Sequence, residues 1–117
     1  MRIVVLAIAL SVATACGASS AAESMAIFTE IMSKGVQVGK NVERLLRSNR
    51  PEAAAVVMNR HIREVDATIE KVVRDRAING SNKVALLKQL RGYRSDLANS
   101  QSQIQAMSNL QDQLRFR

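Results

Sequence analysis

A heptad pattern of apolar residues in the middle of the chain constrains the fold most strongly. Between Pro51 and Ala77, apolar side chains recur at alternating spacings of three and four residues. The pattern comprises Ala55, Met58, Ile62, Val65, Ile69 and Val72. This spacing places them along one side of an α-helix, and the charged residues of the segment lie mostly off that side. A helix with one apolar side needs partners in water, so the pattern predicts a helical bundle.

The segments on either side carry matching patterns, which predicts three helices in all. In Glu23–Arg47 the apolar side is formed by Phe28, Ile31, Gly35, Val38, Val42 and Leu45. From Asn82 toward Leu114 it is formed by Leu86, Leu90, Tyr93, Leu97, Ser100, Ile104, Met107 and Leu114. The connections between the segments are short, and short connections make neighbouring helices antiparallel. We therefore expect an all-α, three-helix up-down-up bundle with coiled-coil-like packing and a long, projecting third helix.

Local signals place the ends of these helices. Residues 48–50 interrupt the first pattern, and Pro51 suits the first position of the next helix, where its missing N–H costs little. Asn79 and Gly80 form a helix stop, and Gly80 is free to adopt positive φ. Ser81 is then the expected N-cap of the third helix.

Residues 1–22 have the pattern of an export signal. Arg2 gives a positive start, and an unbroken apolar run follows from Ile3 to Leu10. That run is shorter than the ~20 residues a membrane-spanning helix needs. Ser20, Ala21 and Ala22 are small residues that suit an ordinary signal peptidase, which would leave residues 23–117 as a single helical domain in the periplasm.

A second processing site competes with the first. Ala13-Thr14-Ala15-Cys16 resembles the lipobox of bacterial lipoproteins, although Leu is usual at the place of Ala13. The resemblance implies that residues 1–15 are the signal, that Cys16 is acylated and that the protein is anchored in the outer membrane. Residues 16–22 would then form a short flexible tether. Because Cys16 is the one cysteine, an intramolecular disulfide and a thiolate metal site are both excluded.

Helix register predicts one packing contact. Gly35 and Tyr93 each lie about eleven residues into their helices, so they reach the same level of the bundle. His61 and Ile62 fall at that level of the central helix. Because Gly35 has no side chain, we expect Tyr93 to pack over it with its hydroxyl at the rim.

The same count leaves the end of the third helix without neighbours, from about Ser108 to Arg117. Leu110, Leu114 and Phe116 lie on this overhang. Apolar side chains on an isolated helix end either fray or bind a partner. They are the candidate partner-binding residues, and a frayed C-terminus is the alternative.

The sequence carries no pattern typical of an enzyme, and we expect no catalytic activity, cofactor or metal. His61 is the one histidine and is read as a boundary residue beside the apolar pattern. No glycine-rich phosphate loop is present. Carboxylates lie four residues from bases, as in Glu30 with Lys34 and Glu43 with Arg47, where pairing stabilises a helix without any catalytic role.

The chain is basic, with a formal net charge of +7. Such a charge raises the chance of an anionic partner but does not bear on the fold. Cations in the last turn of a helix complement its dipole. Lys88, Arg91 and Arg94 do not lie in the last turn of a predicted helix, so the dipole does not account for them. They are candidates for contact with anionic lipid or lipopolysaccharide. Nucleic acid is not expected as a partner, because aromatic residues make up only 3 % of the chain and no nucleic-acid module is visible.

These patterns predict a small exported protein of the bacterial cell envelope that acts without catalysis. Its expected role is that of a protein-binding or structural module, an adaptor or an assembly component. The expected partner is another envelope protein or a second copy, and no small-molecule substrate is indicated. One alternative is a binder of anionic envelope surfaces. A periplasmic holdase is a weaker alternative, since it requires an exposed concave apolar surface that the pattern does not supply.

Overall fold

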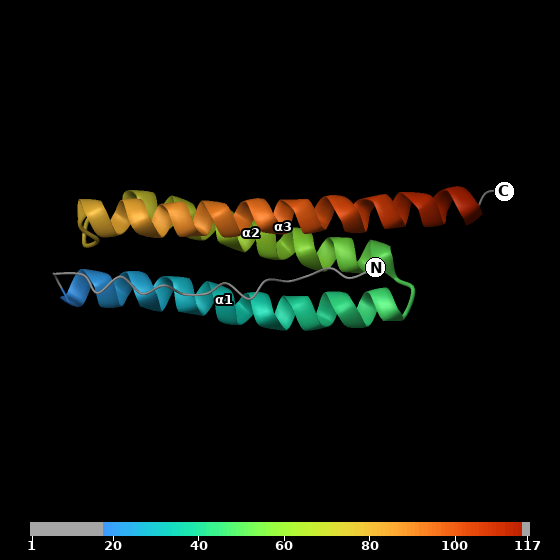
Figure 1. The fold of residues 1–117 in the computed structure, drawn as a ribbon, viewed down its shortest axis with the longest axis horizontal. Coiled ribbons are helices and arrows are strands. Elements are labelled where there is room, and N and C mark those ends of the chain that lie inside the picture. The colour runs from blue at the N-terminus through green and yellow to red at the C-terminus, as the bar shows by residue number, and fades with distance from the viewer. Residues whose placement is uncertain (1–17, 116–117) are drawn as a thin grey trace.

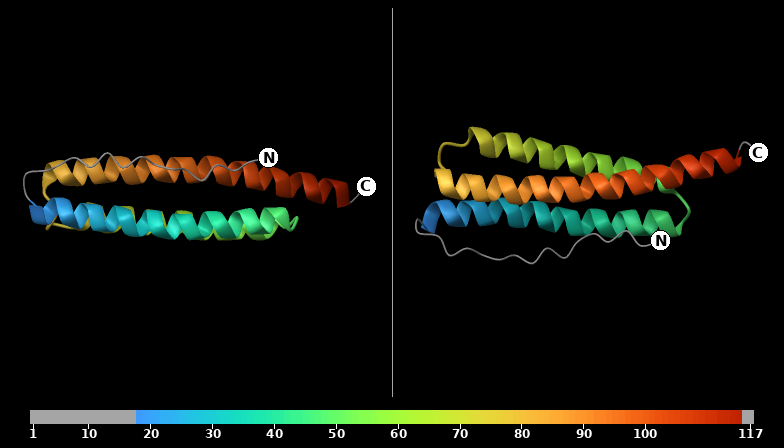
Figure 2. Two further views of the ribbon diagram at one scale, coloured as in Figure 1. Left: turned by 60° about the horizontal axis from the view of Figure 1, so that its bottom comes forward. Right: turned by 45° about the horizontal axis from the view of Figure 1, so that its top comes forward.

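The protein is a bundle of three α-helices in the part of the chain that the structure describes. The computed structural model describes residues 18–115, and these form α1 (Ala18–Arg47), α2 (Pro51–Arg74) and α3 (Gly80–Arg115), with no strand among them. Figure 1 shows α2 returning beside α1, and α3 running back in the direction of α1. The end of α3 reaches past the α1–α2 connection in every view (Figures 1 and 2). The predicted all-α class is confirmed.

The core is built from the heptad residues of all three helices. Met58, Val65 and Leu90 are fully buried, and most other residues predicted to face inward are buried too, whereas Leu114 is 63 % exposed because α3 extends beyond its neighbours (Figure 1). The buried apolar set includes Phe28, Ile31, Val42, Ala55, Ile62, Val72, Leu86, Tyr93, Leu97 and Ile104. α3 packs more extensively against α2 than against α1. The α2–α3 pair is therefore the larger packing unit, and α1 is attached to it.

The α1–α2 connection is a Schellman turn centred on an asparagine. Asn49 has a φ of 59°, the left-handed conformation that asparagine tolerates better than most residues. The amide of Arg50 donates to the carbonyl of Leu45 at 2.8 Å, and the amide of Asn49 donates to that of Leu46 at 3.0 Å. Two carbonyls at the end of α1 are thereby satisfied. Pro51 then occupies the start of α2, as predicted.

The central helix is shorter than predicted. α2 ends at Arg74 instead of Ala77, because Asp75 adopts extended backbone angles. The side-chain Oδ1 of Asp75 accepts a hydrogen bond from the amide of Ala77 at 2.8 Å, which makes an Asx turn. Ile78 is only 3 % exposed and anchors this turn in the core.

The start of α3 differs from the prediction at two positions. Asn79 is the N-cap, since its Oδ1 accepts from the amide of Asn82 at 3.1 Å. Ser81 lies within the first turn and is not the cap. Gly80 does not adopt positive φ and is the first residue of α3. Because asparagine caps a helix as well as serine does, the earlier residue takes the role and the helix begins sooner.

α1 begins five residues before the predicted start at Glu23. Residues 18–22 belong to α1. The tether over residues 16–22, which was expected for the case in which Cys16 is acylated, stays a prediction. Three of these five residues are alanine, the best helix former, and no glycine or proline interrupts them. Cys16 and the signal residues up to 17 lie outside the described part of the chain.

Candidate interaction surface

The end of α3 carries two large exposed apolar side chains. Leu110 is 57 % exposed and Leu114 is 63 % exposed. They are four residues apart, so they lie on the same side of the helix, one turn from each other. Phe116, the third predicted contact residue, lies outside the described residues.

The overhang is shorter than the sequence predicted. Ser108 is only 5 % exposed, and the side-chain amide of Gln111 donates to the backbone carbonyl of Asn49 at 3.2 Å. The Schellman turn between α1 and α2 therefore supports α3 as far as Gln111. The predicted overhang was too long because it was counted from the helices alone. The connection between α1 and α2 extends beyond the ends of these helices and reaches α3.

A groove of about 390 Å³ lies beside the projecting end of α3. It is lined by Asn49, Arg50, Glu52, Ala53, Val56, Gln111 and Arg115. Val56 is 54 % exposed and adds an apolar side chain from α2. Arg50 and Arg115 form no ion pair with any residue in 18–115. Leu110 and Leu114 do not line the groove but directly precede its lining residues Gln111 and Arg115 on α3. We use the name loop-end surface for Val56, Arg50 and Arg115 of the groove together with Leu110 and Leu114. Val56 was missed because it lies off the heptad pattern of α2.

The three basic residues singled out on α3 are not equivalent. Lys88 and Arg91 are exposed and have no acidic partner within residues 18–115. Arg94 instead donates to Asp66 of α2, from Nε to Oδ1 at 2.7 Å and from a terminal nitrogen to Oδ2 at 3.4 Å. This hydrogen bond and the carboxylate charge raise the pKa of Arg94. The positive charge of Arg94 is thus offset by the carboxylate of Asp66 on α2.

A buried polar pair lies at the centre of the bundle. His61 is completely buried, Tyr93 is 2 % exposed, and His61 Nε2 lies 2.7 Å from the Tyr93 hydroxyl. A Cβ at Gly35 would collide with that hydroxyl and would lie 3.1 Å from Tyr93 Cζ. The predicted packing of Tyr93 over Gly35 is confirmed. Two details differ from the prediction. The Tyr93 hydroxyl is buried and not at the rim, and His61 is a core residue and not a boundary residue. Both can be buried because His61 and the Tyr93 hydroxyl form a hydrogen bond with each other.

A chain of charges continues from this pair toward the surface. The carboxylate of Glu64 has one oxygen 3.6 Å from His61 Nδ1, and its other oxygen lies 3.6 Å from the amine of Lys34. Lys34 also pairs with Glu30 at 3.7 Å, as the sequence predicted. Burial raises the pKa of Tyr93 to about 12. Burial also lowers the pKa of His61, against the opposing effect of Glu64. A neutral, buried tyrosine is a poor nucleophile, so the arrangement suits a structural role better than catalysis.

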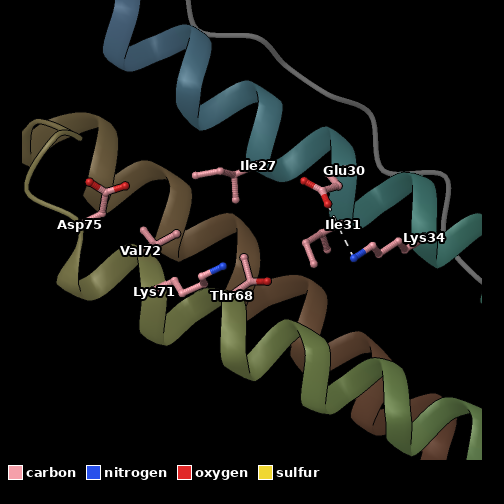
Figure 3. A pocket seen from close by; sticks show the side chains of 8 residues that line it. All are labelled: Ile27, Glu30, Ile31, Lys34, Thr68, Lys71, Val72 and Asp75. Atoms are coloured by element: carbon pink, nitrogen blue, oxygen red, sulfur yellow. Dashed lines mark ion pairs between the residues drawn. The ribbon is translucent and has the colours of Figure 1, made fainter.

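A second groove, of about 290 Å³, lies between α1 and α2. Figure 3 shows its side chains, with Ile27, Ile31 and Val72 between charged residues of both signs. Its charged residues are Glu30, Lys34, Lys71 and Asp75. Because positive and negative charges alternate around it, the groove does not define the charge of a ligand.

No three His, Cys, Asp or Glu residues in 18–115 come together as metal ligands. No helix within that range is long and apolar enough to cross a membrane. Comparison with known protein families, curated proteins and solved structures gives no match.

Proposed function

We propose that this chain is an exported protein of the bacterial envelope that binds another protein, or a second copy of itself, through the loop-end surface. The observation that carries the proposal is the exposure of Leu110 and Leu114, at 57 % and 63 %, on a helix end that projects from the bundle. In this proposal residues 1–22 direct export and residues 23–117 form an up-down-up bundle. Acylation of Cys16 is the alternative route, which anchors the protein in the outer membrane.

The size of the surface suits a transient complex. Fully burying an exposed leucine contributes about 1.5–3 kcal/mol, and Leu110 and Leu114 are already partly buried, so the two together contribute about 2–4 kcal/mol. A Kd of about 1 mM corresponds to about 4 kcal/mol. The exposed side chain of Val56 adds apolar area to this estimate. An amphipathic helix laid against Leu110 and Leu114 is a recognition mode that such a surface fits.

The polar contacts in the bundle support a binding role over a catalytic one. His61 is hydrogen-bonded to Tyr93, and Arg94 donates a hydrogen bond to Asp66. Each pair joins α2 to α3 and thereby stabilises the fold. These two contacts hold the side chains of α2 and α3 to one another, which supports a scaffold whose exposed residues do the binding.

Association of variants tests this proposal. Leu110, Leu114 and Phe116 are replaced together by serine, and copurification of partners from envelope extracts is compared with the unchanged protein. Val84→Ser is the matched control, because Val84 is 68 % exposed and lies near the opposite end of α3. We expect the triple variant to lose its partner and the control to keep it. Equal copurification by both variants would show that the site is wrong.

An anionic envelope surface remains the alternative partner. Lys88 and Arg91 are exposed and unpaired in the described chain, which favours it, whereas the Arg94–Asp66 pair weakens it. Binding to anionic vesicles would then fall steeply with salt, since exposed charges are screened within about 10 Å at 0.1 M. Lys88→Gln with Arg91→Gln should abolish it, while salt-independent binding would count against this partner.

A further inference from the structure

We infer that Gly35, His61 and Tyr93 form a proton-controlled latch that attaches α1 to the other two helices, and that protonation of His61 releases α1. Each helix contributes one of the three residues: α1 carries Gly35, α2 carries His61 and α3 carries Tyr93. We call these residues the latch. The inference concerns regulation of the bundle and does not depend on which partner binds the loop-end surface.

The surroundings of His61 determine where its proton lies at neutral pH. Nδ1 has no hydrogen-bond partner and faces a carboxylate oxygen of Glu64 at 3.6 Å. A carboxylate only accepts hydrogen bonds, so its charge favours an N–H at Nδ1. Nε2 is then left to accept the hydrogen of the Tyr93 hydroxyl, at 2.7 Å. The neutral ring thus satisfies the buried tyrosine.

A second proton on the ring reverses this hydrogen bond. Nε2 then carries a hydrogen and donates to the oxygen of Tyr93, so the hydroxyl hydrogen needs another acceptor. Tyr93 is 2 % exposed and has no other hydrogen-bond partner among residues 18–115. Protonation therefore leaves a buried donor unsatisfied and a positive charge in the core, and both favour opening.

α1 is the element that protonation would release. Lys34–Glu64, at 3.6 Å, is the only ion pair within residues 18–115 that joins α1 to another helix. A charged His61 would face Lys34 across the Glu64 carboxylate, and repulsion between the two positive charges would weaken the hold of α1. The α2–α3 pair has the more extensive packing and keeps its Asp66–Arg94 bond. α1 is thus the helix with the weakest connection, and its Gly35 packs directly against the hydrogen bond between His61 of α2 and Tyr93 of α3.

The groups that face His61 are Lys34 from α1, Glu64 from α2 and Tyr93 from α3. Burial lowers the pKa of His61, Glu64 opposes that effect, and Lys34 adds to it. The folded protein disfavours the charged ring. We therefore expect α1 to be fully attached at pH values above the ordinary histidine pKa of about 6.5. Attachment weakens as the pH falls from there toward the lower pKa of the closed bundle. The ratio of released to attached α1 rises about tenfold per pH unit in that window.

Hydrogen exchange of the full chain, resolved by helix, tests the latch at about pH 7.5 and about pH 5.5, on either side of the histidine pKa. His61→Gln is the control, because an amide in place of Nε2 can bond to Tyr93 but does not titrate. We expect α1 of the unchanged protein to exchange faster at the lower pH than α1 of His61→Gln, by up to about tenfold, with α3 protected in both. Equal exchange of α1 in the two proteins at the lower pH would overturn the inference. Simultaneous loss of protection in all three helices would overturn it as well.

An NMR titration covers the case in which His61→Gln does not fold. The chain has one histidine and one tyrosine, so the imidazole and phenol signals need no further assignment. We expect the His61 signal to titrate below about pH 6.5 and the Tyr93 signal to change with it. A His61 pKa at or above 6.5 would contradict the latch.

Discussion

Replacing Gly35 with alanine tests the packing at the centre of the bundle. Alanine is favoured over glycine inside a helix by about 1 kcal/mol, so an unobstructed site would be stabilised. At Gly35 the new methyl group would collide with the Tyr93 hydroxyl, and it would lie 3.1 Å from Tyr93 Cζ and 3.4 Å from His61 Nε2. Both side chains are buried, so neither moves without disturbing the core.

The expected magnitude follows from these opposing effects. Overpacking of a core costs about 1–3 kcal/mol. A displaced Tyr93 ring also weakens its bond to His61, which is worth about 1 kcal/mol. After the propensity gain is subtracted, Gly35→Ala should destabilise the protein by about 1–3 kcal/mol. For a domain of this size, each kcal/mol lowers Tm by about 4–8 °C.

Gly92→Ala is the matched control, because a Cβ at Gly92 would have no atom within 4 Å apart from its chain neighbours and the nearby backbone of its own helix. It should raise the free energy of unfolding by about 1 kcal/mol in urea denaturation followed by circular dichroism. Gly35→Ala should also cost less in a Tyr93→Phe background, where the colliding oxygen is absent. If Gly35→Ala stabilised the protein as Gly92→Ala does, the close packing of Tyr93 over α1 would be refuted.

Three further predictions follow from the same structure. The Tm should be constant with pH above about 6.5 and should fall below it, because the lowered pKa of His61 makes the unfolded chain bind the additional proton; a Tm of His61→Gln with the same dependence would exclude His61 as the cause. Asn79→Ala should destabilise α3 by about 1 kcal/mol in urea denaturation, whereas Ser81→Ala should change little, and the opposite order would identify Ser81 as the cap. Asn49→Ala should cost about 1–2 kcal/mol because of the positive φ, while Asn49→Gly should be neutral or stabilising, and equal effects of the two changes would argue against a left-handed residue there.

The apolar core could be predicted from the sequence because helical periodicity determines which residues face inward. Met58, Val65 and Leu90 follow that pattern and are buried. The Gly35–Tyr93 contact could be predicted too, since helices that run in the same direction rise at the same rate and bring equally placed residues together.

His61 shows where periodicity is insufficient. It lies one position from the apolar pattern and is polar, so it was assigned to the boundary. Its burial depends on a hydrogen bond to a residue 32 positions away. The Arg94–Asp66 bond spans 28 positions and was missed for the same reason. Side-chain pairs between helices depend on the rotation of each helix, which residue spacing alone does not give.

Helix ends were predicted less well because several residues compete for each role. Asp75 and Asn79 each accept a hydrogen bond from a backbone amide near a helix end, whereas the Ser81 hydroxyl donates to the side chain of Asn79. The length of the overhang was overestimated for a related reason. The contact between Gln111 and the Asn49 carbonyl involves a connection whose path is not encoded in the heptad pattern.

Photo-crosslinking in living cells tests the proposed function most directly. A photoreactive residue at position 114 samples the projecting end of α3, and the same residue at position 84 samples an equally exposed control site on that helix. We predict a discrete protein adduct from position 114 that is missing from position 84. Crosslinks only to lipid or lipopolysaccharide, or none from position 114, would contradict binding of a protein at this surface.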